Sequence, residues 1–305
     1  IHTWQAGLGL PDREYYFKKD DANQIIRNAY VKHIATMFNL VGLNNGESNA
    51  DLVMKLESTL AQQHMKKEQT RDMVALYNKL SQAELAELMP NFNWTAFLQE
   101  AQLPALDGLV VTQLDYMKSL DGIIQTTSID DWKVFLQWGL INASATRLTT
   151  ELDQANFEFY SKVLNGVEQQ LPQWRRAVRL VNNNVGEIIG KVYVKKHFPP
   201  EAKQRMLQMV DNLLKAYETS IKNVDCMTEE TKIQALDKLS KLTPKVGYPD
   251  KWRDYSLLTV NENDLFGNLQ RSSESQHQPM LEKQNGPVQI HEWNMNPQTV
   301  NAYYN

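Results

Sequence analysis

The feature that most constrains the fold is a regular stripe of apolar residues in the second half of the chain. The stripe alternates at spacings of four and three and consists of Trp174, Val178, Val181, Val185, Ile188 and Val192. This is the period of one face of an α-helix. Pro172 lies just before the stripe and Pro199-Pro200 lie beyond it, and proline ends a helix or begins one. The sequence therefore predicts one long helix over most of Trp174 to Lys195, with Gly186 and Gly190 allowing another helix to pack closely.

The same period recurs along the rest of the chain. It predicts a helix from Asp21 to Val41, and another that begins at Pro200 and buries Met206, Val210, Leu213, Leu214, Tyr217 and Ile221. Thr228 is suited to cap the next helix, which Pro244 closes. Further helices are expected near 50–67, 81–89, 93–102, 112–125, 129–146 and 149–167.

Strand signal is scarce by comparison. Only Leu109–Val111 and Thr299–Tyr304 have the short apolar or β-branched and aromatic composition of strands. The polar stretch from Gln270 to Gly286 fits either an exposed helix or a linker. The chain is therefore expected to be mainly α, with few short strands and a strand at its end; the family resemblance given below implies that the helices form one large lobe and that the last strand is an edge strand.

Composition and charge exclude several classes of protein. Of the 305 residues 42% are hydrophobic and 22% are charged, which is ordinary usage for a globular chain and excludes disorder. The net charge of −4 gives no electrostatic reason to bind nucleic acid. The longest uncharged stretch, Val134 to Thr146, is too short to span a bilayer. We therefore expect neither a nucleic-acid partner nor a transmembrane segment within this chain.

The residues that usually carry metal or nucleophile chemistry form no complete site in the sequence. The six histidines are His2, His33, His64, His197, His277 and His291. No two of them are spaced i, i+4, so the helical HExxH zinc motif cannot be built from this chain. His291-Glu292 matches only its first two letters and is interpreted as part of a loop. The single Cys226 excludes an intrachain disulfide and a CxxC motif.

The remaining candidates have ordinary structural interpretations. His33 lies on an apolar stripe and is expected to be a core histidine with its hydrogen bonds satisfied. His64 and Glu68 share a helical face and are interpreted as a solvated pair. Cys226 is expected to be a packing residue rather than a nucleophile. From the residues alone, no metal ligand and no catalytic residue can be assigned in this chain.

Several longer motifs resemble those of one enzyme family. They are Gly7-Leu-Gly-Leu-Pro-Asp-Arg-Glu-Tyr-Tyr16, Asp225-Cys-Met-Thr-Glu-Glu-Thr-Lys232, Lys245-Val-Gly-Tyr-Pro-Asp250 and Asn296-Pro-Gln-Thr-Val-Asn-Ala-Tyr-Tyr-Asn305. In type and order they resemble the neprilysin (M13) family of zinc metalloendopeptidases, and the match extends over essentially the whole chain. The cysteines of vertebrate members are missing here, which favours a bacterial, PepO-like member.

The resemblance implies two largely helical lobes that enclose a water-filled chamber, with a catalytic lobe built from the C-terminal part of a longer protein. Residues 1–258 are expected to form the helical, chamber-forming lobe. Residues 259–305 are expected to form a linker and the first strand of the catalytic lobe. This chain is thus expected to be a piece of a longer protein, with the C-terminal catalytic portion as its partner.

The resemblance also implies a role for Asn301 and Ala302. In the family the corresponding Asn side chain and Ala backbone bind the main chain of a peptide substrate along an edge strand, which is chemically reasonable because an edge strand has unpaired N–H and C=O groups. An ordinary structural edge strand is the alternative interpretation. The one zinc ion, its ligands and the catalytic Glu are expected beyond Asn305, so this chain alone is expected to be inactive.

Three functions remain open at the level of sequence. The chain is part of an active zinc endopeptidase that hydrolyses oligopeptides, part of an inactive peptide-binding or scaffolding relative, or a helical interaction module. An extracytoplasmic location in a bacterium (periplasmic, lipid-anchored or secreted) is expected, with the cytoplasm as the alternative. Neither side-chain specificity nor oligomeric state follows from the sequence.

Overall fold

The computed structural model describes residues 1–103, 106–283 and 286–304. The chain divides into two compact units, Ile1–Gln170 and Leu171–Asn305. Helices dominate both units, which confirms the prediction of a mainly α protein. The predicted division at residues 258 and 259 concerns the lobes of a longer enzyme and stays a prediction.

The first unit is a set of helices, several of which begin at a residue whose side chain caps the helix. Asp20 accepts a hydrogen bond from the backbone N–H of Asn23 at the start of α2, and Ser81 and Glu84 form a capping box at α4. The α-helices are α1 Glu14–Phe17, α2 Asp21–Leu40, α3 Gly46–Gln63, α4 Gln82–Leu88, α5 Trp94–Glu100, α6 Leu114–Thr126, α7 Ile129–Ser144 and α8 Thr150–Asn156. Short 3-10 turns occupy Gln69–Arg71 and Ala145–Arg147. The helix predicted over 149–167 is α8 followed by a π-helical segment, Phe157–Val163.

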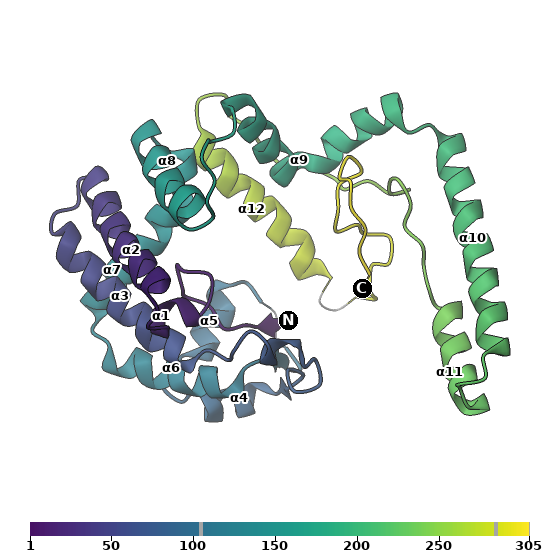
Figure 1. Ribbon diagram of the computed structural model, residues 1–305, viewed down its shortest axis with the longest axis horizontal. Helices are drawn as coiled ribbons and strands as arrows, with labels where there is room; N and C mark the ends of the chain where they lie inside the picture. The colour runs from purple at the N-terminus through teal and green to yellow at the C-terminus, as the bar shows by residue number, and fades with distance from the viewer. Residues whose placement is uncertain (104–105, 284–285, 305) are drawn as a thin grey trace. The chain divides into compact units, whose positions relative to one another are not determined.

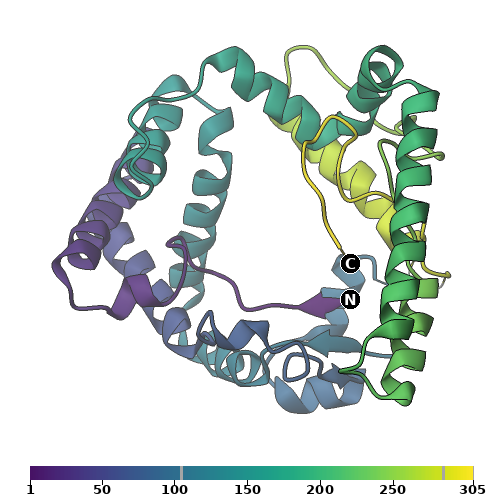
Figure 2. The ribbon, with the colours of Figure 1, turned by 45° about the vertical axis from the view of Figure 1, so that its right-hand side comes forward.

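A small sheet joins distant parts of this unit. Its strands are β1 His2–Thr3, β2 Lys79–Leu80 and β3 Leu109–Val111, in the order β1-β3-β2. Strand β3 pairs parallel with β1 and antiparallel with β2 (Figure 2). The strand predicted at Leu109–Val111 is therefore confirmed, and it is the buried centre of the sheet.

The hydrophobic core of the first unit surrounds a buried carboxyl group. Glu57 is 2% exposed. It accepts hydrogen bonds from the hydroxyls of Tyr16 and Tyr30 at 2.6 and 2.9 Å and from Trp138 Nε1 at 3.3 Å. Burial raises the pKa of Glu57, and these donors act in the opposite direction. The polar network ties α1, α2, α3 and α7 together, and a second apolar cluster lies around Leu85.

The described residues of the second unit form four helices: α9 Gln173–His197, α10 Pro200–Asn223, α11 Glu229–Ser240 and α12 Leu265–Glu282. Figure 1 shows α11 folding back along the C-terminal half of α10, with which it is in contact. Helix α12 decides the open question over 270–286 in favour of a helix as far as Glu282, and residues 284–285 of that stretch lie outside the described residues.

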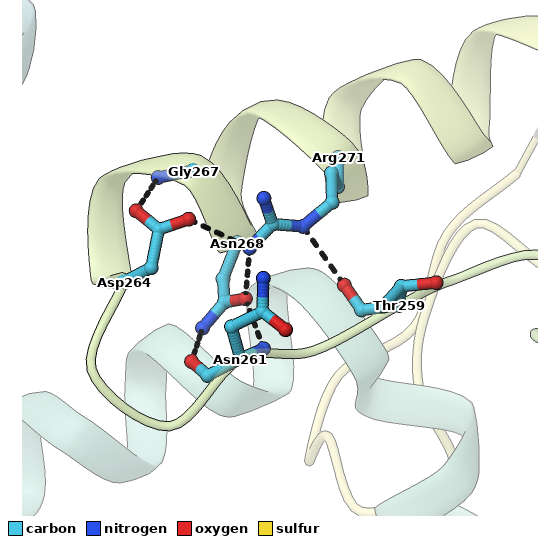
Figure 3. Close-up of polar contacts among 6 residues, drawn as sticks. All are labelled: Thr259, Asn261, Asp264, Gly267, Asn268 and Arg271. Carbon is cyan, nitrogen blue, oxygen red and sulfur yellow. Dashed lines mark hydrogen bonds and ion pairs between the residues drawn. The ribbon is translucent and has the colours of Figure 1, made fainter.

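The start of α12 is held by a polar network (Figure 3). Asp264 Oδ1 accepts from the N–H of Gly267 at 2.9 Å, and Asp264 Oδ2 is 2.9 Å from Arg271 Nη2. Asn268 bonds both the backbone N–H and the carbonyl of Asn261, at 2.8 and 2.7 Å. Arg271 also donates to the carbonyl of Thr259 at 3.0 Å. The loop before α12 is therefore fixed by the first two turns of the helix.

The helices predicted at 174–195 and from Pro200 are confirmed, but the prediction that the helix from Pro200 buries its apolar face is wrong in this structure, and the apolar stripe of α9 is also largely exposed. Trp174, Val178 and Val192 are 63%, 50% and 56% exposed, and Leu213 and Tyr217 are 51% and 60% exposed. Periodicity reports which face of a helix is apolar, whereas burial requires a partner for that face. Among the described residues of the second unit, the buried apolar side chains are those of Val194 and Pro249.

Candidate functional site

The C-terminal segment that carries Asn301 is anchored on the middle of α9 through two side chains. Asn296 Nδ2 donates to the carbonyl of Asn182 at 2.9 Å. Gln298 Nε2 donates to Asn182 Oδ1 at 2.9 Å and to the carbonyl of Gly186 at 3.1 Å. Figures 1 and 2 both show this yellow segment running beside α9. These bonds hold the backbone at Asn296–Gln298 on a residue far away in the sequence: Asn182 precedes Asn296 by 114 residues and Gln298 by 116.

Helix α9 is shaped to receive this anchor. A Cβ on Gly186 would lie 2.1 Å from Asn296 Nδ2, and a Cβ on Gly190 would lie 2.7 Å from Pro297 Cδ. The two glycines therefore allow close approach of a loop, not of another helix as their spacing suggested. Val185 has non-helical dihedral angles (φ −132°, ψ 34°) inside α9, and such a kink weakens the backbone hydrogen bonding around it. The carbonyls of Asn182 and Gly186 accept side-chain donors at this position.

Beyond the anchor the segment is exposed. Val300 is fully exposed, Tyr303 is 38% exposed and Tyr304 is 72% exposed. None of the described residues 299–304 belongs to a strand, so the predicted edge strand is wrong for this structure, and residue 305 lies outside the described residues. A strand is defined by its pairing, and no described segment pairs with residues 299–304.

The two predicted substrate-binding residues lie side by side and bond to each other. Asn301 Oδ1 accepts a hydrogen bond from the backbone N–H of Ala302 at 2.8 Å, and both residues are exposed. Two contacts steady the tyrosines that follow: the N–H of Asn294 donates to the Tyr303 hydroxyl at 3.3 Å, and Lys238 Nζ of α11 lies 5.6 Å from the centroid of the Tyr304 ring. The peptide-binding role of Asn301 and Ala302 stays a prediction.

A second loop, residues 245–253, packs against helices α9 and α10. Glu187 of α9 is 8% exposed and accepts from the N–H of Arg253 at 2.8 Å. Lys203 of α10 donates to the carbonyl of Tyr248 at 2.8 Å and to Asp250 Oδ1 at 2.7 Å, and its Nζ lies 4.3 Å from the centroid of the Tyr248 ring. The Lys245–Asp250 motif is therefore an ordered turn on the start of α10.

Among the histidines and the cysteine, His33 and His64 belong to the first unit, and His291 and Cys226 are exposed residues of the second. His33 is buried as predicted, against Phe159, but its Nε2 has no partner among the described residues, so the expectation that its hydrogen bonds are satisfied is wrong. His64 is 8% exposed and its Nε2 is 3.1 Å from the carbonyl of Ala6, so it is not a solvated partner of Glu68. His291 is an exposed loop residue, as predicted. Cys226 is exposed and is not a packing residue.

Within the described ranges, no three His, Cys, Asp or Glu side chains come together in a way that could hold a metal ion. The donor set of these residues therefore does not fit a zinc site, and no step of zinc chemistry is assigned to them. Over the same residues, no helix is long and apolar enough to cross a membrane.

The comparisons with known proteins decide the family. The N-terminal model of peptidase family M13 matches residues 1–249. The chain belongs to peptidase family M13. Membrane metallo-endopeptidase-like 1 from Mus musculus is 27% identical over all of this chain and 43% of its own length, and endothelin-converting enzyme 1 from Cavia porcellus is 28% identical over all of this chain and 42% of its own length.

Solved structures of two bacterial members of the M13 family have the same fold. The zinc metalloprotease Zmp1 of Mycobacterium tuberculosis, in complex with an inhibitor, is 41% identical with a TM-score of 0.90, over all of this chain and 46% of that one. PepO from Lactobacillus rhamnosis is 21% identical with a TM-score of 0.84, over 94% of this chain and 46% of that one, and at this identity it supports the fold alone. The M13 chain described here thus spans less than half the length of these relatives.

Sequence reasoning on this M13 chain missed Asn182. The signal was present as the polar run Asn182-Asn183-Asn184, which interrupts the apolar character of α9 just before the kink. Asn296 and Gln298 are part of the motif that carried the resemblance, but their part in anchoring the segment is visible only in the structure.

Proposed function

We propose that this chain is part of a zinc-dependent metalloendopeptidase that hydrolyses oligopeptides, and that Asn301 and Ala302 bind the main chain of the substrate. The observation that carries the proposal is an exposed segment of backbone that directly follows residues anchored on α9. Asn296 and Gln298 fix the base on α9, while Asn301 and Ala302 are exposed beyond it. Exposed extended backbone is what a peptide needs in order to add itself as a strand.

The local hydrogen bond between Asn301 and Ala302 suggests how binding proceeds. A substrate N–H would take the place of the Ala302 N–H at Asn301 Oδ1, and a substrate carbonyl would accept from the Ala302 N–H. One local hydrogen bond is then exchanged for two intermolecular ones. Both contacts are with the substrate main chain, so they are independent of its side chains.

The zinc ion, its ligands and the general base are proposed to lie in the portion that follows Asn305. When bound in a metallopeptidase, zinc polarises the peptide carbonyl and activates water. The first lobe is proposed to face the catalytic lobe across a closed chamber that limits access to oligopeptides. An extracytoplasmic location in a bacterium fits relatives that include a protein named as a membrane metallo-endopeptidase.

Replacement of Asn301 by Ala in the full-length enzyme tests the substrate role. It removes the side-chain oxygen that would accept a hydrogen bond from the bound peptide, so kcat/KM should fall by roughly tenfold to a hundredfold. The fall should be similar for peptides of different sequence, and the melting temperature should barely change because the side chain is exposed. Asn294→Ala, at another exposed asparagine of the same segment, is the matched control and should leave kcat/KM unchanged. A lower melting temperature with kcat/KM intact would return Asn301 to a structural role.

An inactive peptide-binding relative is the second candidate, and the same exposed segment would serve it. Zinc analysis and peptide hydrolysis by the full-length protein distinguish the two. The proposed enzyme contains about one zinc ion per chain and cleaves peptides, whereas the relative binds peptides with the same dependence on Asn301 and cleaves none. The 305 residues alone are proposed to do neither zinc binding nor hydrolysis, and near-stoichiometric zinc in the dialysed chain would contradict this.

A further inference from the structure

A cavity in the first unit lies beside the motif Gly7–Tyr16. Its volume is about 340 Å³, which is within the range of roughly 300–1,000 Å³ that small-molecule sites have. Residues 4–8 and 10–13 form one part of its wall, and residues 64, 65, 67 and 70 form the rest. All of these residues belong to the first unit. The cavity is therefore a feature of that unit alone.

Arg13 is the residue of the motif that packing does not explain. Leu10 and Tyr16 belong to the hydrophobic core. Asp12 Oδ1 accepts a hydrogen bond from the backbone N–H of Glu14 at 2.8 Å. The Arg13 guanidinium has no hydrogen-bond or ion-pair partner among the described residues, although its Nε is buried. Its charge lines the cavity without a counter-ion.

The wall of the cavity has more positive than negative charge. Lys67 lines it as well and, like Arg13, forms no ion pair in the described part of the chain. Burial lowers the pKa of His64, the hydrogen bond to the Ala6 carbonyl raises it, and the positive charge of Arg13 lowers it further, so the imidazole is neutral at pH 7. With two cations, the carboxylate of Asp12 and a neutral histidine, the wall has a net charge of +1.

The position of Arg13 favours one kind of anion. A guanidinium that is partly withdrawn from water is costly unless an anion lies beside it. Its fork of N–H donors matches the two oxygens of a carboxylate, and a net charge of +1 is balanced by a single negative charge. Arg13 Cζ lies 5.9 Å from the centroid of the Phe17 ring, so an aromatic ring already supports the guanidinium on one side.

The rest of the wall suits an apolar body. Trp4 lines the cavity and is 52% exposed, so its indole ring is available to a ligand. Leu8, Pro11 and Met65 add aliphatic surface to the same wall. A ligand that combines an aromatic ring with a carboxylate would contact both kinds of surface.

We propose that this cavity binds a small molecule that carries an aromatic ring and a carboxylate. Arg13 pairs with the carboxylate, Lys67 adds to the attraction, and Trp4 contacts the ring. The inference goes beyond the proposed function, because Asn301 and Ala302 belong to the second unit and the cavity belongs to the first.

Calorimetric titration of the full-length protein with phenylacetate tests the proposal. We expect saturable binding with a Kd of about 1 mM or below. Phenylacetamide has the same shape without the charge, and acetate has the charge without the ring, so each should bind at least about tenfold more weakly.

Three variants locate the bound carboxylate. Arg13→Gln should weaken phenylacetate binding by at least about tenfold, and Lys67→Gln should weaken it by about threefold, since an exposed charge contributes less. Arg147→Gln, at an exposed arginine outside the cavity, is the matched control and should leave the affinity unchanged. If Arg13→Gln fails to fold, Lys67→Gln decides, and an unchanged affinity in that variant overturns the proposal.

Each other outcome also overturns the proposal. Equal binding of phenylacetamide would mean that the charge is not recognised, and tighter binding of inorganic phosphate would identify a phosphate site. Binding that disappears when zinc is removed but persists in Arg13→Gln would place the ligand on the metal ion. A titration without saturation at about 10 mM would mean that the cavity takes no such ligand in the full-length protein. The measurement is independent of catalysis, because an inactive relative would bind phenylacetate while failing the hydrolysis assay.

Discussion

The substitution Gly186→Ala tests whether the anchor on α9 holds the substrate-binding segment. Inside an exposed helix, replacing glycine by alanine normally stabilises the helix by up to about 1 kcal/mol, because alanine restricts the unfolded chain. At Gly186 the added methyl group would lie 2.1 Å from Asn296 Nδ2 and 2.4 Å from its Cγ. Such a distance is well inside van der Waals contact, so the Asn296 side chain has to leave.

The magnitude follows from the hydrogen bonds of the anchor, all of which we expect to break when Asn296 is displaced. Asn296 makes one bond to Asn182, and Gln298 makes one to Asn182 and one to Gly186. Each contributes about 1 kcal/mol, so their loss costs about 3 kcal/mol against a helix-propensity gain of about 1 kcal/mol. The net destabilisation of the anchored segment is therefore about 2 kcal/mol. In the full-length enzyme kcat/KM should fall by at least about tenfold.

Gly122→Ala in α6 is the matched control, because an added Cβ there meets nothing within 4 Å. It should raise the melting temperature slightly and leave kcat/KM unchanged. Amide hydrogen exchange in the full-length protein provides the local measurement, since residues 296–299 should lose protection in Gly186→Ala and keep it in Gly122→Ala. If Gly186→Ala behaves like Gly122→Ala in all three measurements, the anchor does not hold the segment and the reasoning is refuted.

Two further predictions concern the core of the first unit. Burial lowers the pKa of His33 from 6.5 to about 4, so as the pH falls the unfolded chain binds a proton at His33 before the folded chain does. The contribution of neutral His33 to stability is therefore complete above pH 6.5 and is lost as the pH falls toward 4. Between pH 7.5 and 5 the wild type should lose about 2 kcal/mol of unfolding free energy more than His33→Phe. Equal losses in denaturant titrations of the two proteins would contradict this, and His291→Phe, at an exposed loop position, is the control. Glu57→Leu leaves the hydroxyl donors of Tyr16 and Tyr30 unpaired in the core, while Trp138 Nε1 keeps the Tyr30 hydroxyl as its acceptor, and the substitution should cost about 3 kcal/mol or more. Glu57→Gln keeps one acceptor and should cost less, and equal unfolding free energies for the two variants would show that the donors find other partners.

The sequence by itself determined the local structure of this protein and its family. The helices from Asp21, Trp174, Pro200 and Glu229 lie where the apolar period and the capping residues predicted them. The strand at Leu109–Val111 also lies where its composition predicted it. These features depend on hydrogen bonds and caps between residues close in the chain, so a short window of sequence contains the information.

Only the tertiary structure decided which surfaces meet. The contact of Gly186 with Asn296 and the burial of His64 against Ala6 each join residues more than fifty positions apart in the sequence. The kink at Val185 is a local distortion that no spacing rule predicts. The apolar stripes of α9 and α10 show the same limit. An apolar face indicates that a helix needs a packing partner, but it does not indicate which residues form that partner. Periodicity is a property of one helix, whereas burial is a property of two surfaces, and the second surface is specified elsewhere in the chain.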